Sequence, residues 1–120
     1  MNYKTGDISL VRFPRTDLGV GKYRPVLLIA KMPGPFSDWL ICAITSQFKH
    51  EIKNWDEKIG IKDEDFIISG LKVPSLVRIG KLATVEEDIF EGVLGKISSQ
   101  RLKKILKKLG KYFEKNASEG

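Results

Sequence analysis

An unbroken run of apolar residues from Val26 to Ala30 places the strongest constraint on the fold of this chain. Polar residues do not alternate with the apolar ones, so the run is typical of a strand buried on both faces. Pro25 precedes it and suits the first residue of a strand, where the missing N–H costs least. Pro25 also holds Arg24 extended. We therefore expect Arg24 at the mouth of a core strand, where its guanidinium either grips a phosphate or closes a surface ion pair.

Further short apolar segments follow along the chain, and Gly, Pro and small polar residues separate them. We predict strands over 7–13, ending at Pro14, and over 25–30, 39–45, 58–61, 66–68, 75–79, 81–85 and 89–94, with 81–85 continuing or pairing with 75–79. Residues 15–23 form a polar loop, and 48–65 a longer excursion of mixed charge. Helical crossovers between the strands are absent, which favours a small β-barrel over a parallel sheet. The expected fold class is β-rich (α+β), with five to seven strands.

A helix over about 98–115, capped by Ser98 or Ser99, is expected to close the barrel. Its apolar stripe consists of Leu102, Ile105, Leu106, Leu109 and Phe113, and its opposite face of Lys103, Lys104, Lys107, Lys108 and Lys111. Residues 98–120 carry a balance of +5 and the first 97 residues only +1 of the net +6. The basic face is either a solvated surface or a contact for RNA or an acidic partner. The 120 residues are enough for one domain, 1–120.

Several classes of function find no support in the sequence. The single Cys42 lies in an apolar run, which predicts a buried thiol and a reducing, cytoplasmic setting. No segment resembles a signal peptide or a membrane span. The only histidine, His50, stands in the polar excursion, and no His/Cys cluster predicts a metal site or a cofactor. The acidic run 86–88 is typical of a solvated turn.

The remaining candidates are polar groups at predicted strand ends: Arg24, Thr45, Ser46, Gln47, Ser75 and Arg78. Guanidinium and hydroxyl groups can bind a phosphodiester and stabilise the charge that builds on it. They supply no evident general base, because Arg stays protonated. The structural alternative is that the hydroxyl groups cap turns of the backbone.

At these positions the sequence resembles the MazF/PemK toxins, the endoribonucleases of type II toxin–antitoxin systems. The motifs occur in the family order over roughly residues 5–110: Gly6-Asp7-Ile8 with Phe13-Pro14, Lys22-Tyr23-Arg24-Pro25-Val26, Ile44-Thr45-Ser46-Gln47, and Gly70-Leu71 followed by Pro74-Ser75 and Arg78. The resemblance implies an SH3-like β-barrel with a C-terminal helix, working as a homodimer with a cognate antitoxin. It also implies metal-independent cleavage of single-stranded RNA at short sequences, leaving 2′,3′-cyclic phosphate and 5′-hydroxyl ends.

The resemblance also assigns roles to individual residues. It implies that Arg24 and Thr45 are catalytic. The expected substrate contacts are Lys22, Ser46, Gln47, Ser75 and Arg78, and the expected turn-formers are Gly6, Pro14 and Gly70. Tyr23 departs from the family, which often has a second basic residue there, and this implies a weaker charge contact with RNA. Such a site works without histidine because the 2′-hydroxyl of RNA is an internal nucleophile, so in-line geometry and charge neutralisation suffice.

Two alternatives stay open from the sequence. One is a binding module on the same barrel that holds RNA without cutting it. The other is a poison of DNA gyrase resembling the CcdB toxins. The Arg-Pro and Thr-Ser pairs at strand ends favour the ribonuclease, by resemblance.

Overall fold

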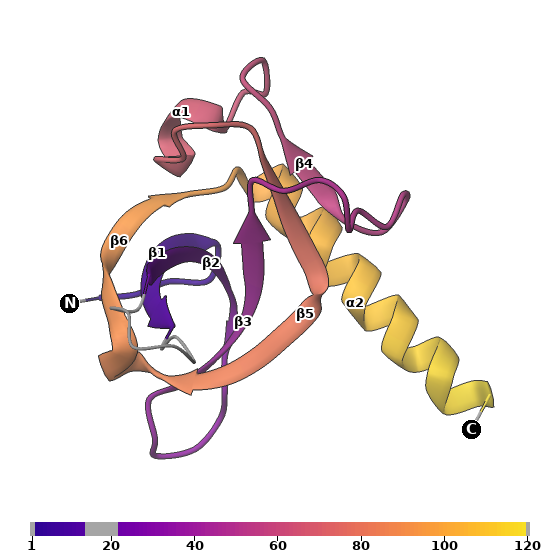
Figure 1. Cartoon of the computed structure of the whole chain (residues 1–120). Helices are drawn as coiled ribbons and strands as arrows, with labels where there is room; N and C mark the ends of the chain where they lie inside the picture. The colour runs from indigo at the N-terminus through magenta and orange to yellow at the C-terminus, as the bar shows by residue number, and fades with distance from the viewer. Residues whose placement is uncertain (1, 14–21, 120) are drawn as a thin grey trace.

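The computed structural model of the protein describes residues 2–13 and 22–119 (Figure 1). Its strands are β1 (Asp7–Phe13), β2 (Lys22–Lys31), β3 (Asp38–Thr45), β4 (Glu57–Ile59), β5 (Ser75–Glu86) and β6 (Phe90–Lys96). Its helices are α1 (Phe66–Ser69) and α2 (Ser99–Glu119), and a 3₁₀ turn, η1 (Glu87–Ile89), joins β5 to β6. The predicted turn at Pro14 and loop residues 15–21 lie outside the described residues.

The six strands form one antiparallel sheet in the order β4-β5-β3-β2-β1-β6. The sheet curls on itself, and β5 and β6 sweep round β1, β2 and β3 in Figure 1. Residues 75–79 and 81–85 belong to one strand. A register shift lets Ala43 pair with Arg78 while the preceding Cys42 pairs with Leu82. Such an irregularity bends a strand and increases its twist. The expected β-rich barrel with a C-terminal helix is confirmed.

Strand β2 is buried on both faces, as predicted. Leu27 and Ile29 lie in a core cluster shared with α2, and Val26 and Leu28 lie in a second cluster on the other face. The strand begins at Lys22, so the prediction that it starts at residue 25 is wrong. Pairing of β2 with β3 begins only at Val26, so the missing N–H of Pro25 interrupts no ladder with β3.

The single cysteine is a core residue, in agreement with its apolar sequence context. Cys42 is fully buried within the cluster that α2 covers. Burial, with a smaller contribution from the charge of Asp56, raises the pKa of the Cys42 thiol to about 12. The thiol is therefore neutral and unreactive at physiological pH.

The prediction of a strand over 66–68 is wrong, because these residues form the single helical turn α1. Gly70 ends this turn with φ of 74°, a conformation that glycine adopts without strain. Ile67 and Ile68 are 88% and 46% exposed, so only Phe66 of the apolar run packs against the core. A Cβ on Gly95 would lie 2.2 Å from the carbonyl oxygen of Ile68. The backbones of α1 and β6 thus touch, and only glycine fits between them.

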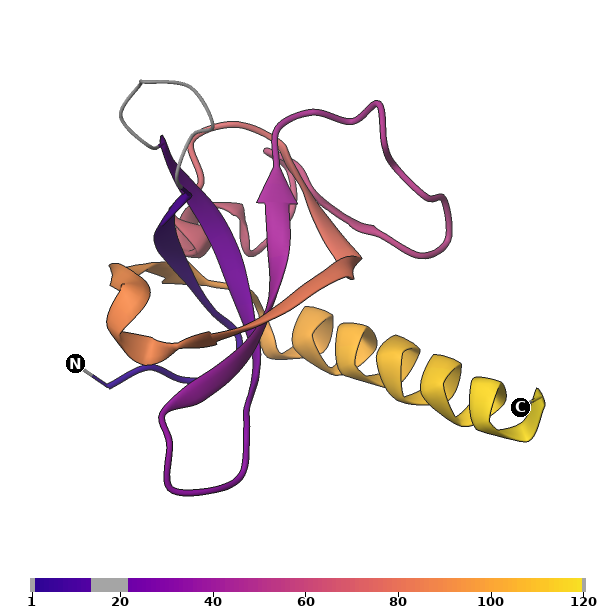
Figure 2. The ribbon, with the colours of Figure 1, turned by 60° about the horizontal axis from the view of Figure 1, so that its bottom comes forward.

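Helix α2 begins where Ser98 accepts a hydrogen bond from the backbone N–H of Arg101, 3.1 Å away, which selects Ser98 as the cap. Ile105 and Leu109 are buried against the barrel. Beyond them the helix projects away from the barrel, and Phe113 is exposed (Figure 2). No helix in residues 2–13 and 22–119 is long and apolar enough to cross a membrane.

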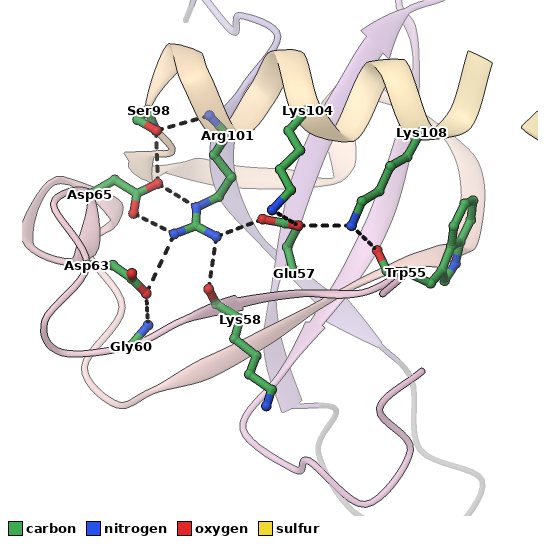
Figure 3. A network of polar contacts seen from close by, with 10 residues as sticks. All are labelled: Trp55, Glu57, Lys58, Gly60, Asp63, Asp65, Ser98, Arg101, Lys104 and Lys108. Atoms are coloured by element: carbon green, nitrogen blue, oxygen red, sulfur yellow. Dashed lines mark hydrogen bonds and ion pairs between the residues drawn. The ribbon is translucent and has the colours of Figure 1, made fainter. Parts of the chain in front are cut away.

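Arg101 is the centre of a polar network between α2 and residues 51–65 (Figure 3). Its guanidinium donates to both carboxylate oxygens of Asp65, at 2.8 and 3.1 Å, and to Glu57 at 3.0 Å. Lys104 and Lys108 also reach Glu57, at 3.1 and 3.0 Å. The Lys104 side chain stays 62% exposed, as a solvated face predicts, whereas the Lys108 side chain is only 22% exposed and is held within the fold. Three carboxylates of the excursion, Glu57, Asp63 and Asp65, are thus paired with cations of α2.

Candidate active site

The start of β2, the end of β3 and the segment leading into β5 meet at one rim of the barrel (Figure 2). A groove of about 590 Å³ lies there. Six of the predicted site residues line it: Lys22, Arg24, Thr45, Ser46, Gln47 and Ser75. Tyr23, Leu71, Lys72, Val73 and Leu94 also line it. Residues far apart in the sequence are thus brought together. The predicted site residue missing from the lining is Arg78.

The strand register places Arg24, Thr45 and Arg78 on one face of the sheet. Ala43 pairs with Val26 on one side and with Arg78 on the other, so these three side chains share a face. Side chains alternate along a strand, so Arg24 and Thr45, each two residues beyond the Val26–Ala43 pair, point to that same face. They occupy matching positions where β2 and β3 separate. Arg78 therefore shares a face with the two residues predicted to be catalytic, although it does not line the groove.

Two of the candidate hydroxyl groups take part in turns. The Oγ1 atom of Thr45 accepts a hydrogen bond from the backbone N–H of Gln47, at 3.0 Å. This bond uses a lone pair and leaves the hydroxyl hydrogen of Thr45 able to donate. Ser75 is buried, and its hydroxyl donates to the carbonyl of Val73 at 2.9 Å. The Ser75 hydroxyl is thus directed into the groove wall, whereas Ser46 and Gln47 are exposed.

The groove is electrostatically one-sided. Lys22, Arg24 and Lys72 line it, and its described lining contains no carboxylate. None of these three cations forms an ion pair with a residue in 2–13 or 22–119. Lys72 was not among the residues predicted from the sequence. Its position between the turn at Gly70 and the next strand is the signal that could have placed it in the groove lining. Cations that pair with no carboxylate of the described residues suit a polyanionic ligand.

A second hollow, of about 570 Å³, lies between residues 51–65 and α2, and it differs in this respect. Most of its carboxylates are paired with cations: Glu57, Asp63 and Asp65 contact Arg101, Lys104 or Lys108 (Figure 3), and Glu51 pairs with Lys58. Burial alone raises the pKa of Asp65, but hydrogen bonds from Arg101 and Ser98 outweigh it and hold the pKa below its ordinary value. These paired groups hold α2 against residues 51–65.

The other sequence candidates show no sign of a site. His50 is exposed in a turn. In the acidic run, Glu87 accepts a hydrogen bond from the indole of Trp39 at 3.0 Å, which is a structural contact. No group of three or more His, Cys, Asp or Glu residues in the described part of the chain could hold a metal ion.

Comparison with known proteins agrees with the geometry. Residues 4–113 match the sequence model of the family described as PemK-like, MazF-like toxin of type II toxin–antitoxin system. No curated protein matches the chain. Since the match covers almost the whole chain, including every strand and the rim that carries Arg24 and Thr45, the chain belongs to the PemK-like, MazF-like toxins of type II toxin–antitoxin systems.

Proposed function

We propose that this toxin is an endoribonuclease that cleaves single-stranded RNA at short sequences. The observation that carries the proposal is the position of Arg24 and Thr45. They occupy matching positions on one face, at the rim of a groove whose lining, in the part of the chain that the structure describes, has cations and no carboxylate. Such a site binds a polyanion and directs a guanidinium and a hydroxyl at one of its phosphates.

The proposed reaction uses the 2′-oxygen of RNA as its nucleophile. A bond forms between this oxygen and phosphorus as the 2′-hydroxyl gives up its proton to solvent, the bond from phosphorus to the 5′-oxygen breaks, and the 5′-oxygen takes up a proton from solvent. The products are a 2′,3′-cyclic phosphate and a 5′-hydroxyl. Arg24 stabilises negative charge on the phosphate oxygens, and the free hydroxyl hydrogen of Thr45 donates to the same group. The reaction needs an in-line arrangement, which binding on both sides of the phosphate provides.

The remaining residues would hold the strand. Lys22 is an exposed cation at the groove and contacts a flanking phosphate in the proposed complex. Ser46 and Gln47 follow Thr45 and contact the substrate next to the scissile group. Arg78 supplies a second guanidinium on the face of Arg24. Ser75 is the exception among the predicted contacts, since its buried hydroxyl shapes the wall.

The proposal is tested with a long RNA in the presence of a chelator, followed by mapping of the cut sites and their end groups. Arg24→Ala is expected to lower the cleavage rate on the order of a hundredfold or more. Arg24→Lys restores the rate only in part, because an ammonium does not reproduce a guanidinium fork. Thr45→Val removes only the hydroxyl and also slows cleavage. Lys31→Ala is the matched control, since Lys31 is an exposed cation at the opposite end of the same strand.

The outcomes separate the alternatives. Near-parental cleavage by folded Arg24→Ala and Thr45→Val proteins contradicts the assigned roles. Binding of RNA without cleavage by the parent protein favours the binding module. Binding of DNA gyrase with no effect on RNA favours the gyrase poison.

The proposal extends to the assembly and its setting. The toxin acts as one domain over residues 1–120, as a homodimer, and a cognate antitoxin with an acidic segment covers the Arg24 side of the barrel. Charge complementarity would make that association fast. The buried, reduced Cys42 fits a cytoplasmic setting. A monomer in sedimentation at micromolar concentration contradicts the dimer.

A further inference from the structure

Tyr23 is an aromatic residue between two cations at the rim of the groove. It lies on β2 between Lys22 and Arg24, and 47% of it is exposed. It pairs directly with Arg12 of β1. The guanidinium carbon of Arg12 lies 4.9 Å from the centroid of the Tyr23 ring. An aromatic ring that contacts a guanidinium on one side and faces a groove has a defined position and an available surface.

The face of the sheet distinguishes Tyr23 from Arg24. Successive side chains on a strand point to opposite faces, so the Tyr23 ring and the Arg24 guanidinium lie on the two sides of β2. Leu27, in register with Tyr23, packs in the cluster covered by α2, which places the ring on the inner side of the rim. The groove lining there includes Leu71, Val73 and Leu94. An RNA chain crossing the rim therefore meets a cation on one side of β2 and an aromatic, apolar surface on the other.

We infer that Tyr23 stacks on a nucleobase next to the phosphate held by Arg24, with Arg12 supporting the opposite side of the ring. The inference rests on the proposed function, because it names how the same groove holds its RNA. A base offers a flat surface to an aromatic ring whatever its identity, and such stacking stabilises bound single strands. Tyr23 thus contacts the substrate but takes no part in making or breaking bonds. It orients the nucleotide and leaves the chemistry to Arg24 and Thr45.

The experiment pairs protein variants with RNA oligonucleotides that contain one abasic nucleotide. The mapped cut site is placed in a short RNA, and each position near the cut is made abasic in turn. Cleavage is measured for the parent protein, Tyr23→Ala, Tyr23→Phe and Tyr23→Lys. Affinity is measured separately with an oligonucleotide whose attacking 2′-hydroxyl is replaced by hydrogen. Tyr112→Ala is the matched control. Tyr112 belongs to α2, is 51% exposed, packs its ring against Trp55 and lies outside the groove lining.

Tyr23→Ala is expected to lower kcat/KM on the order of tenfold on the intact RNA, mainly through KM. Tyr23→Phe keeps the parental value, and Tyr23→Lys does not restore it. At one abasic position the parent falls to the level of Tyr23→Ala, and the variant loses nothing further, because the two changes remove the same contact. Tyr112→Ala leaves every value unchanged.

Parental cleavage by Tyr23→Ala overturns the inference while the proposed function stands. If Tyr23→Ala lowers kcat/KM by the same factor on the intact RNA and on every abasic RNA, the inference is also overturned. Full activity of Tyr23→Lys likewise overturns it, because a charge contact would then explain the role of this position. If no RNA is cut, but the deoxy oligonucleotide binds the parent protein and Tyr23→Phe more tightly than Tyr23→Ala, the proposed function fails and the stacking stands. Absence of binding overturns both.

Discussion

Arg101→Ala removes the centre of the network that fastens α2 to the barrel. The guanidinium is only 13% exposed, and its partners Asp65 and Glu57 are 2% and 7% exposed at their side chains. It also donates to the carbonyl of Lys58 at 2.9 Å. The substitution therefore leaves the buried Asp65 carboxylate without the positive charge that compensates it. Asp65 keeps the backbone N–H of Ser98, at 3.0 Å, as its remaining partner from α2.

The expected loss of unfolding free energy at neutral pH is about 3–5 kcal/mol, the cost of removing one partner from a buried ion pair. Glu57 still has Lys108, which places the loss toward the lower end of that range. A domain of this size has a total stability of about 5–15 kcal/mol, so the loss is a large share of it. The corresponding fall in Tm is about 10–20 °C.

The pH dependence provides an independent check. Burial raises the pKa of both carboxyls, but hydrogen bonds from Arg101 to Asp65 and from Lys108 and Lys104 to Glu57 outweigh it, so both pKa values are lowered. At a pH above the ordinary carboxyl pKa values, the parent protein therefore has the full stabilisation from these contacts. It loses that stabilisation as the pH falls through the lowered pKa values of the folded protein. In the Arg101→Ala variant, burial is expected to dominate and raise the pKa of Asp65. Protonation of Asp65 then removes the cost of its buried charge. The gap between the two proteins narrows toward about pH 4.

Urea unfolding followed by circular dichroism, at pH 7 and near pH 4, measures both quantities. Lys103→Ala is the matched control, because Lys103 is exposed on the same helix and pairs with no residue in 2–13 or 22–119. It is expected to change the stability by less than about 0.5 kcal/mol. In Arg101→Ala protein, adding Asp65→Asn costs little further, since it removes the buried charge that has lost its guanidinium partner. A loss below 1 kcal/mol at pH 7, or a loss independent of pH, refutes this account.

Other expected outcomes follow from single contacts. Gly95→Ala destabilises the protein by about 1–3 kcal/mol or more in the same urea assay, because its Cβ would lie 2.2 Å from the Ile68 carbonyl oxygen. Gly110→Ala instead stabilises it by about 0.5–1 kcal/mol, since this helical position has open space around it. Cys42 resists iodoacetamide in the native state and reacts after unfolding, because burial raises the pKa of its thiol to about 12; rapid native alkylation, followed by mass spectrometry, contradicts this. Lys72→Ala raises KM for RNA severalfold with little change in kcat and makes binding less sensitive to salt, as loss of one phosphate contact requires.

Local patterns were sufficient to predict most of the elements. The apolar run after Pro25 predicts a doubly buried strand, and β2 supplies both core clusters. The helical spacing near the C-terminus predicts α2, with Ile105 and Leu109 at its buried positions. The pairs Arg24-Pro25 and Thr45-Ser46 lie near the ends of two strands that the sequence predicts. These features depend on residues close together in the chain, and so the sequence alone determines them.

Tertiary structure decided what depends on distant partners. The apolar segment 66–68 satisfies a strand pattern, yet it forms α1, because Gly70 ends a helical turn and Gly95 lets that turn touch β6. Arg101 resembles any other cation of a basic helix until folding places two buried carboxylates beside it. The shared face of Arg24, Thr45 and Arg78 depends on strand register, and a shift of one residue in register would reverse it. No local pattern encodes these arrangements, since each is set by the alignment of segments that are distant in sequence.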